Sequence, residues 1–227
     1  MNETFDAIAW DAWRKQEIEK HGNDPTGWIN VSKNLIVSGA MLVAPYSSAM
    51  VIMLRNVTNG GSDSDRPRTA KEEEIIRRGH QTHSIGLMLF AFSIECLLKA
   101  LFLKRGGVLY ENGRFKSPTR LAKSHNLLEI AESYACSTLF TEHQCEILDL
   151  LSARNEMGRY PVHSKYDSYG TQPPSSDGFS RFYGLWDASK SATVFDILNI
   201  LYQELDDEIP SEADELREEI RVVRSLY

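Results

Sequence analysis

The feature that most constrains the fold is the run from Ile85 to Leu103, IGLMLFAFSIECLLKALFL, which is apolar at nearly every position. A capping box, Thr69-Ala-Lys-Glu72, precedes this run, and in such a box the threonine hydroxyl and the glutamate carboxylate satisfy the first free backbone N–H groups of a helix. Gly106-Gly107 ends the pattern. Because a helix that is apolar on every side must be surrounded by other elements, the sequence predicts a central core helix from residue 69 to about residue 104.

Two charges interrupt the apolar run. Glu95 and Lys99 lie four residues apart, in the acid-first order that lets two side chains pair along a helix. In one interpretation they mark the solvent edge of an otherwise buried helix. In the other they pair across to Arg154, further along the chain, since a charge near a core usually has a partner. Both interpretations stay open from the sequence.

Apolar side chains at helical spacing predict further helices along the chain. The predicted segments are 5–21, 125–135, 141–158, 179–205 and an acidic helix at 212–226. In the first of them, Trp10 and Trp13 lie side by side, and core packing is predicted for both, with a partner-binding surface as the alternative. Asn112-Gly113 predicts a tight hairpin turn. Since no stretch is rich in strand periodicity, the predicted fold class is all-α.

The segment from Asn34 to Leu54 carries no charge and is long enough to span a bilayer, which takes about 20 residues. Pro45, Tyr46, Ser47 and Ser48 divide it into two shorter apolar pieces. Each piece suits a buried helix in a bundle better than a membrane span. The sequence therefore predicts a pair of buried helices at 34–54 and no membrane segment.

The composition limits the environment and the partners. A formal net charge of −7 argues against wholesale coating of nucleic acid and leaves room for a local basic site. Cys96, Cys136 and Cys145 are widely spaced and form no CxxC pair, which predicts buried or free thiols in a reducing compartment. The first residues, MNETFDAIAWDAW, are acidic where a signal peptide is basic, so a cytoplasmic protein is predicted. A metal site built on His80 and His83 would lack carboxylate partners, and no metal or other cofactor is predicted.

The clearest candidate site is the stretch LDLLSARNEMGRYPVH, where an apolar helix runs into a cluster of polar side chains. The cluster consists of Arg154, Asn155, Arg159, Tyr160 and His163. All five side chains can reach a phosphate, and none belongs in a dry core. The transition from a rigid helix to a loop is also a common place for binding groups.

Three stretches together, AFSIECLLKALFL, SHNLLEIA and ARNEMGRYPVH, resemble the HEPN superfamily over residues 69–205. Glu95 and Lys99 fall on a family Glu and Lys, and His125 and Leu127 fall on a family His-x-Leu segment. The resemblance implies an up-and-down bundle of four to five helices, and ribonuclease activity without a metal in catalytic members, which usually dimerise. It implies a HEPN-like bundle at 69–207, N-terminal helices at 1–60 packed on it and an acidic C-terminal helix at 211–227. Many HEPN proteins also act with a nucleotidyltransferase partner, which is left open for this chain.

Catalytic members of the family carry an arginine, four to six further residues, and then a histidine. Arg154 matches that arginine, and Asn155 the residue that often follows it, but the next histidine is His163, after eight intervening residues. Cleaving RNA without a metal needs a base for the 2′-OH proton and a cation for the charge that develops on the phosphate. Arg154 and Arg159 can serve as the cation, and His163 or Tyr160 as the base. The expected phosphate-binding residues are Arg154, Asn155, Arg159 and Lys99, with Glu95 in support.

Three functions stay open on these grounds. The first is an HEPN-like protein that binds RNA or nucleotide phosphate through Arg154 and Arg159 with little or no cleavage. The second is a metal-independent endoribonuclease of the toxin or defence type. The third is a non-enzymatic helical interaction module, in which the two arginines make structural bridges to Glu95 and Glu156 and the function lies in a dimer or partner surface.

Overall fold

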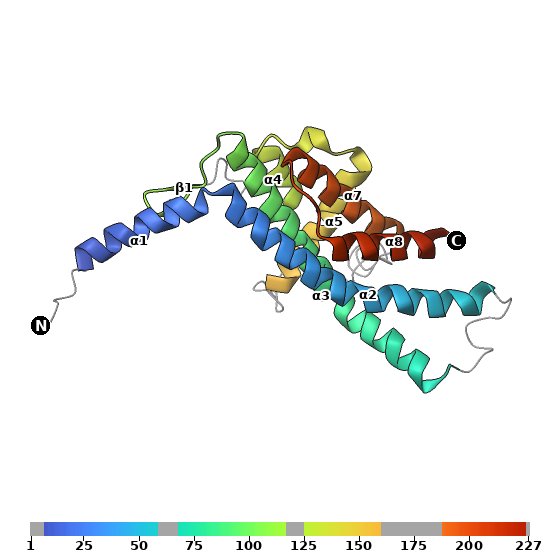
Figure 1. Cartoon of the computed structure of the whole chain (residues 1–227). Coiled ribbons are helices and arrows are strands. Elements are labelled where there is room, and N and C mark those ends of the chain that lie inside the picture. The colour runs from blue at the N-terminus through green and yellow to red at the C-terminus, as the bar shows by residue number, and fades with distance from the viewer. Residues whose placement is uncertain (1–6, 59–67, 117–124, 160–187, 226–227) are drawn as a thin grey trace, which may run out of the picture.

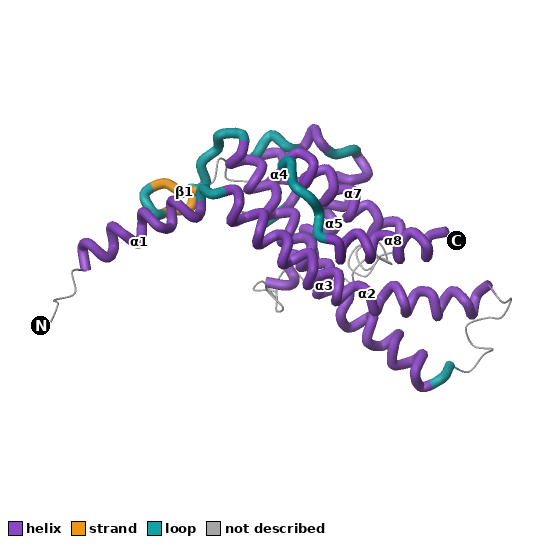
Figure 2. Tube along the Cα trace, viewed as in Figure 1, coloured by secondary structure: helices purple, strands orange, loops and turns teal. Residues whose placement is uncertain are grey.

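The chain folds into an all-α helical bundle, which confirms the predicted fold class. The computed structural model describes residues 7–58, 68–116, 125–159 and 188–225, and this part is helical almost throughout (Figure 2). The helices are α1 (Ala7–Gly22), α2 (Pro25–Thr58), α3 (Ala70–Lys104), α4 (Leu127–Ser133), α5 (Glu142–Arg159), α7 (Ala188–Glu204) and α8 (Ser211–Ser225). A 3-10 turn, η2 (Ser137–Leu139), follows α4, and two short strands, β1 (Tyr110–Glu111) and β2 (Arg114–Phe115), form an antiparallel hairpin.

Helix α3 is the core of the bundle, as the apolar run predicts. Its side chains Leu97, Leu98 and Leu101 are buried, and the helix packs against α2, α4, α5 and α7. The Thr69 side chain accepts from the backbone N–H of Glu72, and the Glu72 carboxylate accepts from the backbone N–H of Thr69. Both halves of the predicted capping box are therefore present. Surrounding helices bury the second half of this helix on several sides, which explains why so few positions from Ile85 onward are polar.

Among the described residues, one stretch is long and apolar enough to cross a membrane. It is Ile85–Lys104 in α3, and not the segment 34–54 that the sequence analysis weighed as a span. Within the bundle 67% of this stretch is buried. A core helix of a soluble protein has the same composition, and the packing of other helices around α3 accounts for it.

Helix α2 is one continuous helix, so the predicted pair of helices at 34–54 is wrong. Pro45 lies inside α2, where a proline removes one hydrogen bond and usually bends the helix. Figure 1 shows α2 changing direction along its length. The Thr82 hydroxyl of α3 donates to the backbone carbonyl of Leu42 at 2.7 Å, so the neighbouring helix supplies a donor close to the proline. Packing against α3 thus keeps α2 helical where the local sequence predicted a break.

Glycines bring α2 and α3 into close contact. A Cβ atom added at Gly39 would lie 3.2 Å from the Gly86 carbonyl oxygen, and one added at Gly86 would lie 3.0 Å from the Gly39 carbonyl oxygen. Further along, a Cβ atom at Gly79 would lie 2.8 Å from the Pro45 carbonyl oxygen. The two backbones can approach this closely because these positions carry no side chain.

We expect Gly86→Ala to lower the free energy of unfolding by about 1 to 2 kcal/mol, because overpacking outweighs the better helix propensity of alanine. The new methyl group would also meet Val43 Cγ2 at 2.5 Å. Gly27→Ala is the matched control, since Gly27 lies in α2 and the nearest atom to an added Cβ is 3.7 Å away. Urea denaturation should show a loss at Gly86 and an unchanged or higher stability at Gly27. Equal effects at the two positions would contradict the close packing of the helices.

Helix α1 extends away from the bundle (Figure 1), and the predicted core packing of its tryptophans is wrong. Trp10 and Trp13 are each 50% exposed and stack on each other with ring centroids 4.8 Å apart. The helix is held near its C-terminal end instead. The Asn23 side chain accepts from the backbone N–H of Leu109 and Tyr110 and donates to the Tyr110 carbonyl. These bonds fix the end of α1 on the hairpin and place the tryptophans beyond the bundle.

The hairpin forms where the sequence predicts it. Asn112 and Gly113, with φ of 54° and 70°, both adopt the left-handed conformation that a tight two-residue turn requires. Glu19 of α1 accepts from the backbone N–H of Gly113 at 2.7 Å. The hairpin therefore connects α1 to the body of the protein.

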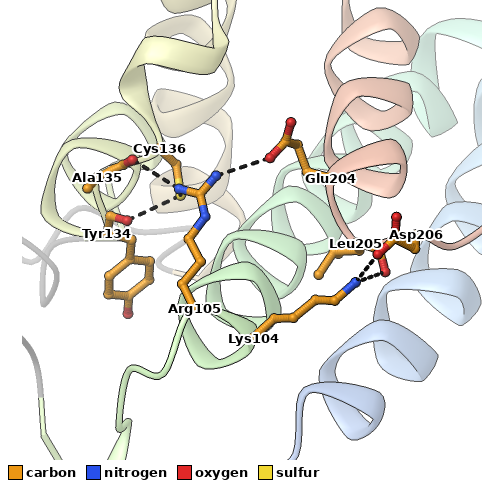
Figure 3. A network of polar contacts seen from close by, with 8 residues as sticks. All are labelled: Lys104, Arg105, Tyr134, Ala135, Cys136, Glu204, Leu205 and Asp206. Atoms are coloured by element: carbon orange, nitrogen blue, oxygen red, sulfur yellow. Dashed lines mark hydrogen bonds and ion pairs between the residues drawn. The ribbon is translucent and has the colours of Figure 1, made fainter.

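Two basic residues at the C-terminal end of α3 tie other helices together (Figure 3). Lys104 Nζ donates to the Leu205 carbonyl at 2.6 Å and to Asp206 at 2.7 Å, at the end of α7. Arg105 donates to the Ala135 carbonyl after α4 and to Glu204 of α7, both at 3.1 Å. The ends of α3, α4 and α7 are thus joined by charged donors that satisfy free carbonyl groups.

The three cysteines are free thiols, as predicted, with Cys96 and Cys136 buried and Cys145 partly buried. Burial raises the pKa of the Cys136 thiol, although the nearby Arg105 guanidinium acts in the opposite direction. A buried thiol with a raised pKa is mostly protonated and weakly reactive. A packing role therefore fits Cys136 better than a nucleophilic one.

The acidic helix α8 packs on α2 and α7 and closes the bundle. Ala213 and Leu216 are buried, and Arg217 pairs with Asp196 of α7 at 3.0 Å. The carboxylates of its first two turns are exposed, which matches the predicted solvated face. The predicted division into segments 1–60, 69–207 and 211–227 stays a prediction.

Candidate functional site

The predicted phosphate-binding cluster lies at the C-terminal half of α5. Arg154, Asn155 and Arg159 belong to this helix, which runs through to Arg159 instead of stopping at the predicted Gly158. The side chains of the three residues lie outside the described part of the structure, as do Tyr160 and His163 entirely. Their predicted roles stay predictions. The structure does describe Ser152 of α5 and the nearby residues Glu95, Lys99 and His125.

Glu95 and Lys99 form an ion pair inside the bundle. The Lys99 Nζ atom lies 2.7 Å from the Glu95 Oε1 atom, and the side chains are 13% and 5% exposed respectively. The interpretation that these charges mark a solvent edge is therefore wrong. Taking two charges out of water costs free energy that their attraction only partly returns, so a buried pair is weak evidence for a purely stabilising role.

Aromatic rings surround the Lys99 ammonium group. It lies 4.6 Å from the ring centroid of Trp28 and 5.8 Å from that of Phe115. The Trp28 Nε1 atom donates to the Gly22 carbonyl, which fixes the indole ring at the start of α2. The face of an aromatic ring attracts a cation. Lys99 is thus held by a carboxylate and a ring, and its expected contact with phosphate stays a prediction.

His125 joins the same carboxylate from a different part of the chain. Its Nδ1 atom lies 3.4 Å from Glu95 Oε1, at the long end of the hydrogen-bonding range, and its side chain is 38% exposed. From the sequence alone, His125 matched a family pattern but had no expected role in the site. The adjacent Asn126 is a typical N-cap residue, which indicates that a helix begins just after His125.

The segment that carries His125 is fastened to α5. The backbone N–H of Leu127 donates to the Ser152 hydroxyl at 2.8 Å, and that hydroxyl donates to the Leu148 carbonyl at 2.6 Å. Arg154 follows Ser152 by two residues. The structure therefore places the turn of α5 that carries Arg154 next to the chain segment of His125.

We call Glu95, Lys99 and His125 the His125 cluster. The electrostatic influence of its carboxylate extends to Tyr134: burial first, and then the negative charge of Glu95, raise the pKa of the Tyr134 hydroxyl. That phenol stays neutral over the physiological range as a result.

Two further histidines of the described part, His83 and His143, lie apart from this cluster. His83 is buried at the contact between α2 and α3, where its ring stacks on Tyr46 with centroids 3.8 Å apart. His143, in the first turn of α5, is exposed and lies 3.4 Å from Glu146. In the described part of the chain, no three His, Cys, Asp or Glu residues gather in a way that could hold a metal ion.

The described part of the chain is thus a helical bundle with a buried ion pair, Glu95 with Lys99, whose carboxylate also meets His125. No family model, curated protein or solved structure matches this chain.

Proposed function

We propose that this chain is a cytoplasmic HEPN-like protein that binds RNA or nucleotide phosphate through the C-terminal half of α5. The observation that supports the proposal is the hydrogen bond from the backbone N–H of Leu127 to the Ser152 hydroxyl, which joins the chain segment just after His125 to the part of α5 that leads to Arg154. Buried charges with specific partners are common at functional sites, where their cost in stability is tolerated.

Arg154 and Arg159 are the proposed phosphate ligands, with Asn155 and Lys99 in support. Guanidinium groups stay charged and bind phosphate oxygens with two parallel hydrogen bonds. The net charge of −7 requires such binding to be local. The resemblance also suggests a homodimer, a toxin or defence context and a nucleotidyltransferase partner, all of which belong to the proposal.

A second candidate is a helical interaction module, and a specific observation favours it. Ile8, Trp10 and Trp13 of α1 are exposed on a helix that extends from the bundle. Exposed tryptophans are enriched at the centres of protein interfaces. In this alternative, Arg154 and Arg159 make structural bridges and contact no RNA.

The test is binding of a fluorescently labelled single-stranded RNA, followed by anisotropy between about 50 and 200 mM salt. Arg154→Ala and Arg159→Ala should each weaken binding and reduce the slope of log K against log salt concentration by about 0.7, the value for one lost phosphate contact on a single strand. Arg77→Ala is the control, because Arg77 is exposed and pairs with Glu74 within α3.

Three outcomes separate the two candidates. Weaker binding in the α5 variants with unchanged binding in Arg77→Ala supports the proposal. No binding by the folded wild type contradicts it. If Arg154→Ala lowers the melting temperature and leaves RNA binding unchanged, the arginine is a structural bridge and the interaction module stands.

A further inference from the structure

We propose that the hairpin is a cover over Lys99 and that the C-terminal end of α1 is the latch that keeps this cover closed. The cover consists of residues 110–115, and the latch of Glu19, Gly22 and Asn23. Figure 1 shows β1 beside this end of α1, at one end of the bundle. The inference goes beyond the proposed function, because it concerns access to a buried cation and holds whatever the ligand is.

The cover meets Lys99 through an aromatic ring. The ring centroid of Phe115 lies 5.8 Å from Lys99 Nζ, near the limit of about 6 Å for attraction between a cation and an aromatic face. Phe115 is 39% exposed, and its ring meets that of Tyr110 edge to face. Trp28 of α2 lies closer to the ammonium group, at 4.6 Å. The hairpin therefore supplies the weaker and more exposed of the two aromatic contacts with Lys99.

The latch holds the hairpin through several short hydrogen bonds. The Glu19 carboxylate accepts from the backbone N–H of Gly113 at 2.7 Å. The Asn23 side chain makes three bonds of 2.8 to 2.9 Å with the backbone of Leu109 and Tyr110. The Tyr110 ring also packs against Gly22, where any Cβ atom would collide with it. The contact with α1 is thus stronger than the contact with Lys99, so the latch determines whether the cover stays closed.

The hairpin depends on α1 for its position. Each strand is two residues long, and the strands pack chiefly on α1 and on each other. A two-stranded hairpin by itself is marginally stable at best in water. Leu109, just before the cover, is buried in the core. We therefore expect that release of the latch moves residues 110–115 away from Lys99 while Leu109 stays in place.

Closure of the cover keeps the Lys99 ammonium group from ligands. Its side chain is 13% exposed, and it pairs with Glu95 at 2.7 Å. Because desolvation offsets much of the attraction within a buried ion pair, the return of both charges to water costs little free energy. Opening is therefore opposed mainly by the latch, and a partner that pulls α1 from the hairpin would expose the cation.

The test is acetylation of lysines with acetic anhydride, with the extent at each lysine read by mass spectrometry. Glu19→Ala removes a bond of the latch. Glu17→Ala is the matched control, since Glu17 lies on the same helix and contacts His21 at 3.1 Å within α1. We expect Lys99 to react about 10-fold faster in Glu19→Ala, the change in an opening equilibrium when a hydrogen bond to a charged group is lost. Lys71, exposed in the first turn of α3, should react alike in all three proteins.

Asn23→Ala removes the other hydrogen bonds of the latch and should change the reactivity of Lys99 in the same direction. Because Asn23 lies between α1 and α2, this variant needs a control for loosening of the whole bundle. The Cys136 thiol is buried in the core, where a thiol reagent such as DTNB reaches it only when the core opens. It should stay unreactive in both latch variants.

A separate measurement relates the cover to the proposed function. If Lys99 is a phosphate ligand, Glu19→Ala should bind the labelled single-stranded RNA more tightly, because a larger fraction of molecules is open. The slope of log K against log salt concentration should become steeper by about 0.7 for the added phosphate contact. Glu17→Ala removes the same negative charge and leaves the latch intact, so the difference between the two variants measures the opening.

The outcomes separate this inference from the proposed function. Faster labelling of Lys99 in a latch variant, with Glu17→Ala like wild type and Cys136 unreactive, supports the cover. The inference is overturned if Lys99 of the wild type reacts as fast as Lys71, if neither latch variant changes its labelling, or if Cys136 reacts in step with it. If the labelling rises in the latch variants while no form of the protein binds RNA, the cover stands and the proposed function fails.

Discussion

Lys99→Ala is expected to lower the free energy of unfolding by about 3 to 5 kcal/mol, which is the usual cost of leaving one partner of a buried ion pair without the other. Glu95 is 5% exposed, so water cannot replace the lost ammonium group without opening the bundle. His125 also contacts the Glu95 carboxylate, at 3.4 Å. Because this contact remains after Lys99 is removed, we expect the loss of stability to fall at the lower end of the range.

Urea denaturation of Lys99→Ala and of Lys116→Ala measures the difference. Lys116 pairs with Glu111 at 2.8 Å, but both side chains are more than half exposed, and an exposed pair contributes about 0 to 1 kcal/mol. The double variant Lys99→Met with Glu95→Leu should recover most of the loss, because an apolar pair requires no desolvation of charge. If Lys99→Ala behaves like Lys116→Ala, the ion pair is solvated and the buried cluster does not exist as described.

Phe90→Ala is expected to destabilise the protein by about 3 to 5 kcal/mol through loss of apolar contact and formation of a cavity. Phe90 is buried on α3 and meets Phe195 of α7 edge to face, with ring centroids 5.4 Å apart. The same ring lies against Gly39, where an added Cβ would be 2.8 Å from Phe90 Cε1. The side chain thus fills the space between α2, α3 and α7.

The measurement is thermal and urea unfolding of Phe90→Ala beside Ile85→Ala, a control on the same helix whose side chain is exposed and whose loss should cost little. A double-mutant cycle adds a sharper criterion. Gly39→Ala should destabilise the wild type but have less effect in Phe90→Ala, because the ring that it would strike is gone. Additive effects of the two substitutions would contradict the contact between Gly39 and Phe90.

Local signals in the sequence predict the elements of this fold well. The predicted Thr69 capping box is present in the structure. At the start of α5, Thr141 and Gln144 likewise exchange hydrogen bonds between side chain and backbone. The Asn112-Gly113 turn forms with both residues at positive φ. Each of these motifs forms within four residues, so the stabilisation it provides depends little on the rest of the chain.

The same local patterns predict only part of the candidate site. The spacing of Glu95 and Lys99 predicts their pairing correctly, because residues four apart meet on any helix. It could not predict that His125 contacts the same carboxylate, since the two residues lie 30 positions apart and meet only through the packing of α3 against the start of α4.

Short-range patterns predict the all-α class, the central helix α3 and most helix boundaries, because helical period and capping are properties of short segments. Which faces of the helices are covered depends on how the helices pack. Trp10 and Trp13 are exposed because α1 extends beyond the bundle, and α2 continues through Pro45 because α3 lies along it. Glu95 and Lys99 are buried because Trp28 and the hairpin cover them. Periodicity states which side chains share a face, whereas burial depends on the element that packs against that face.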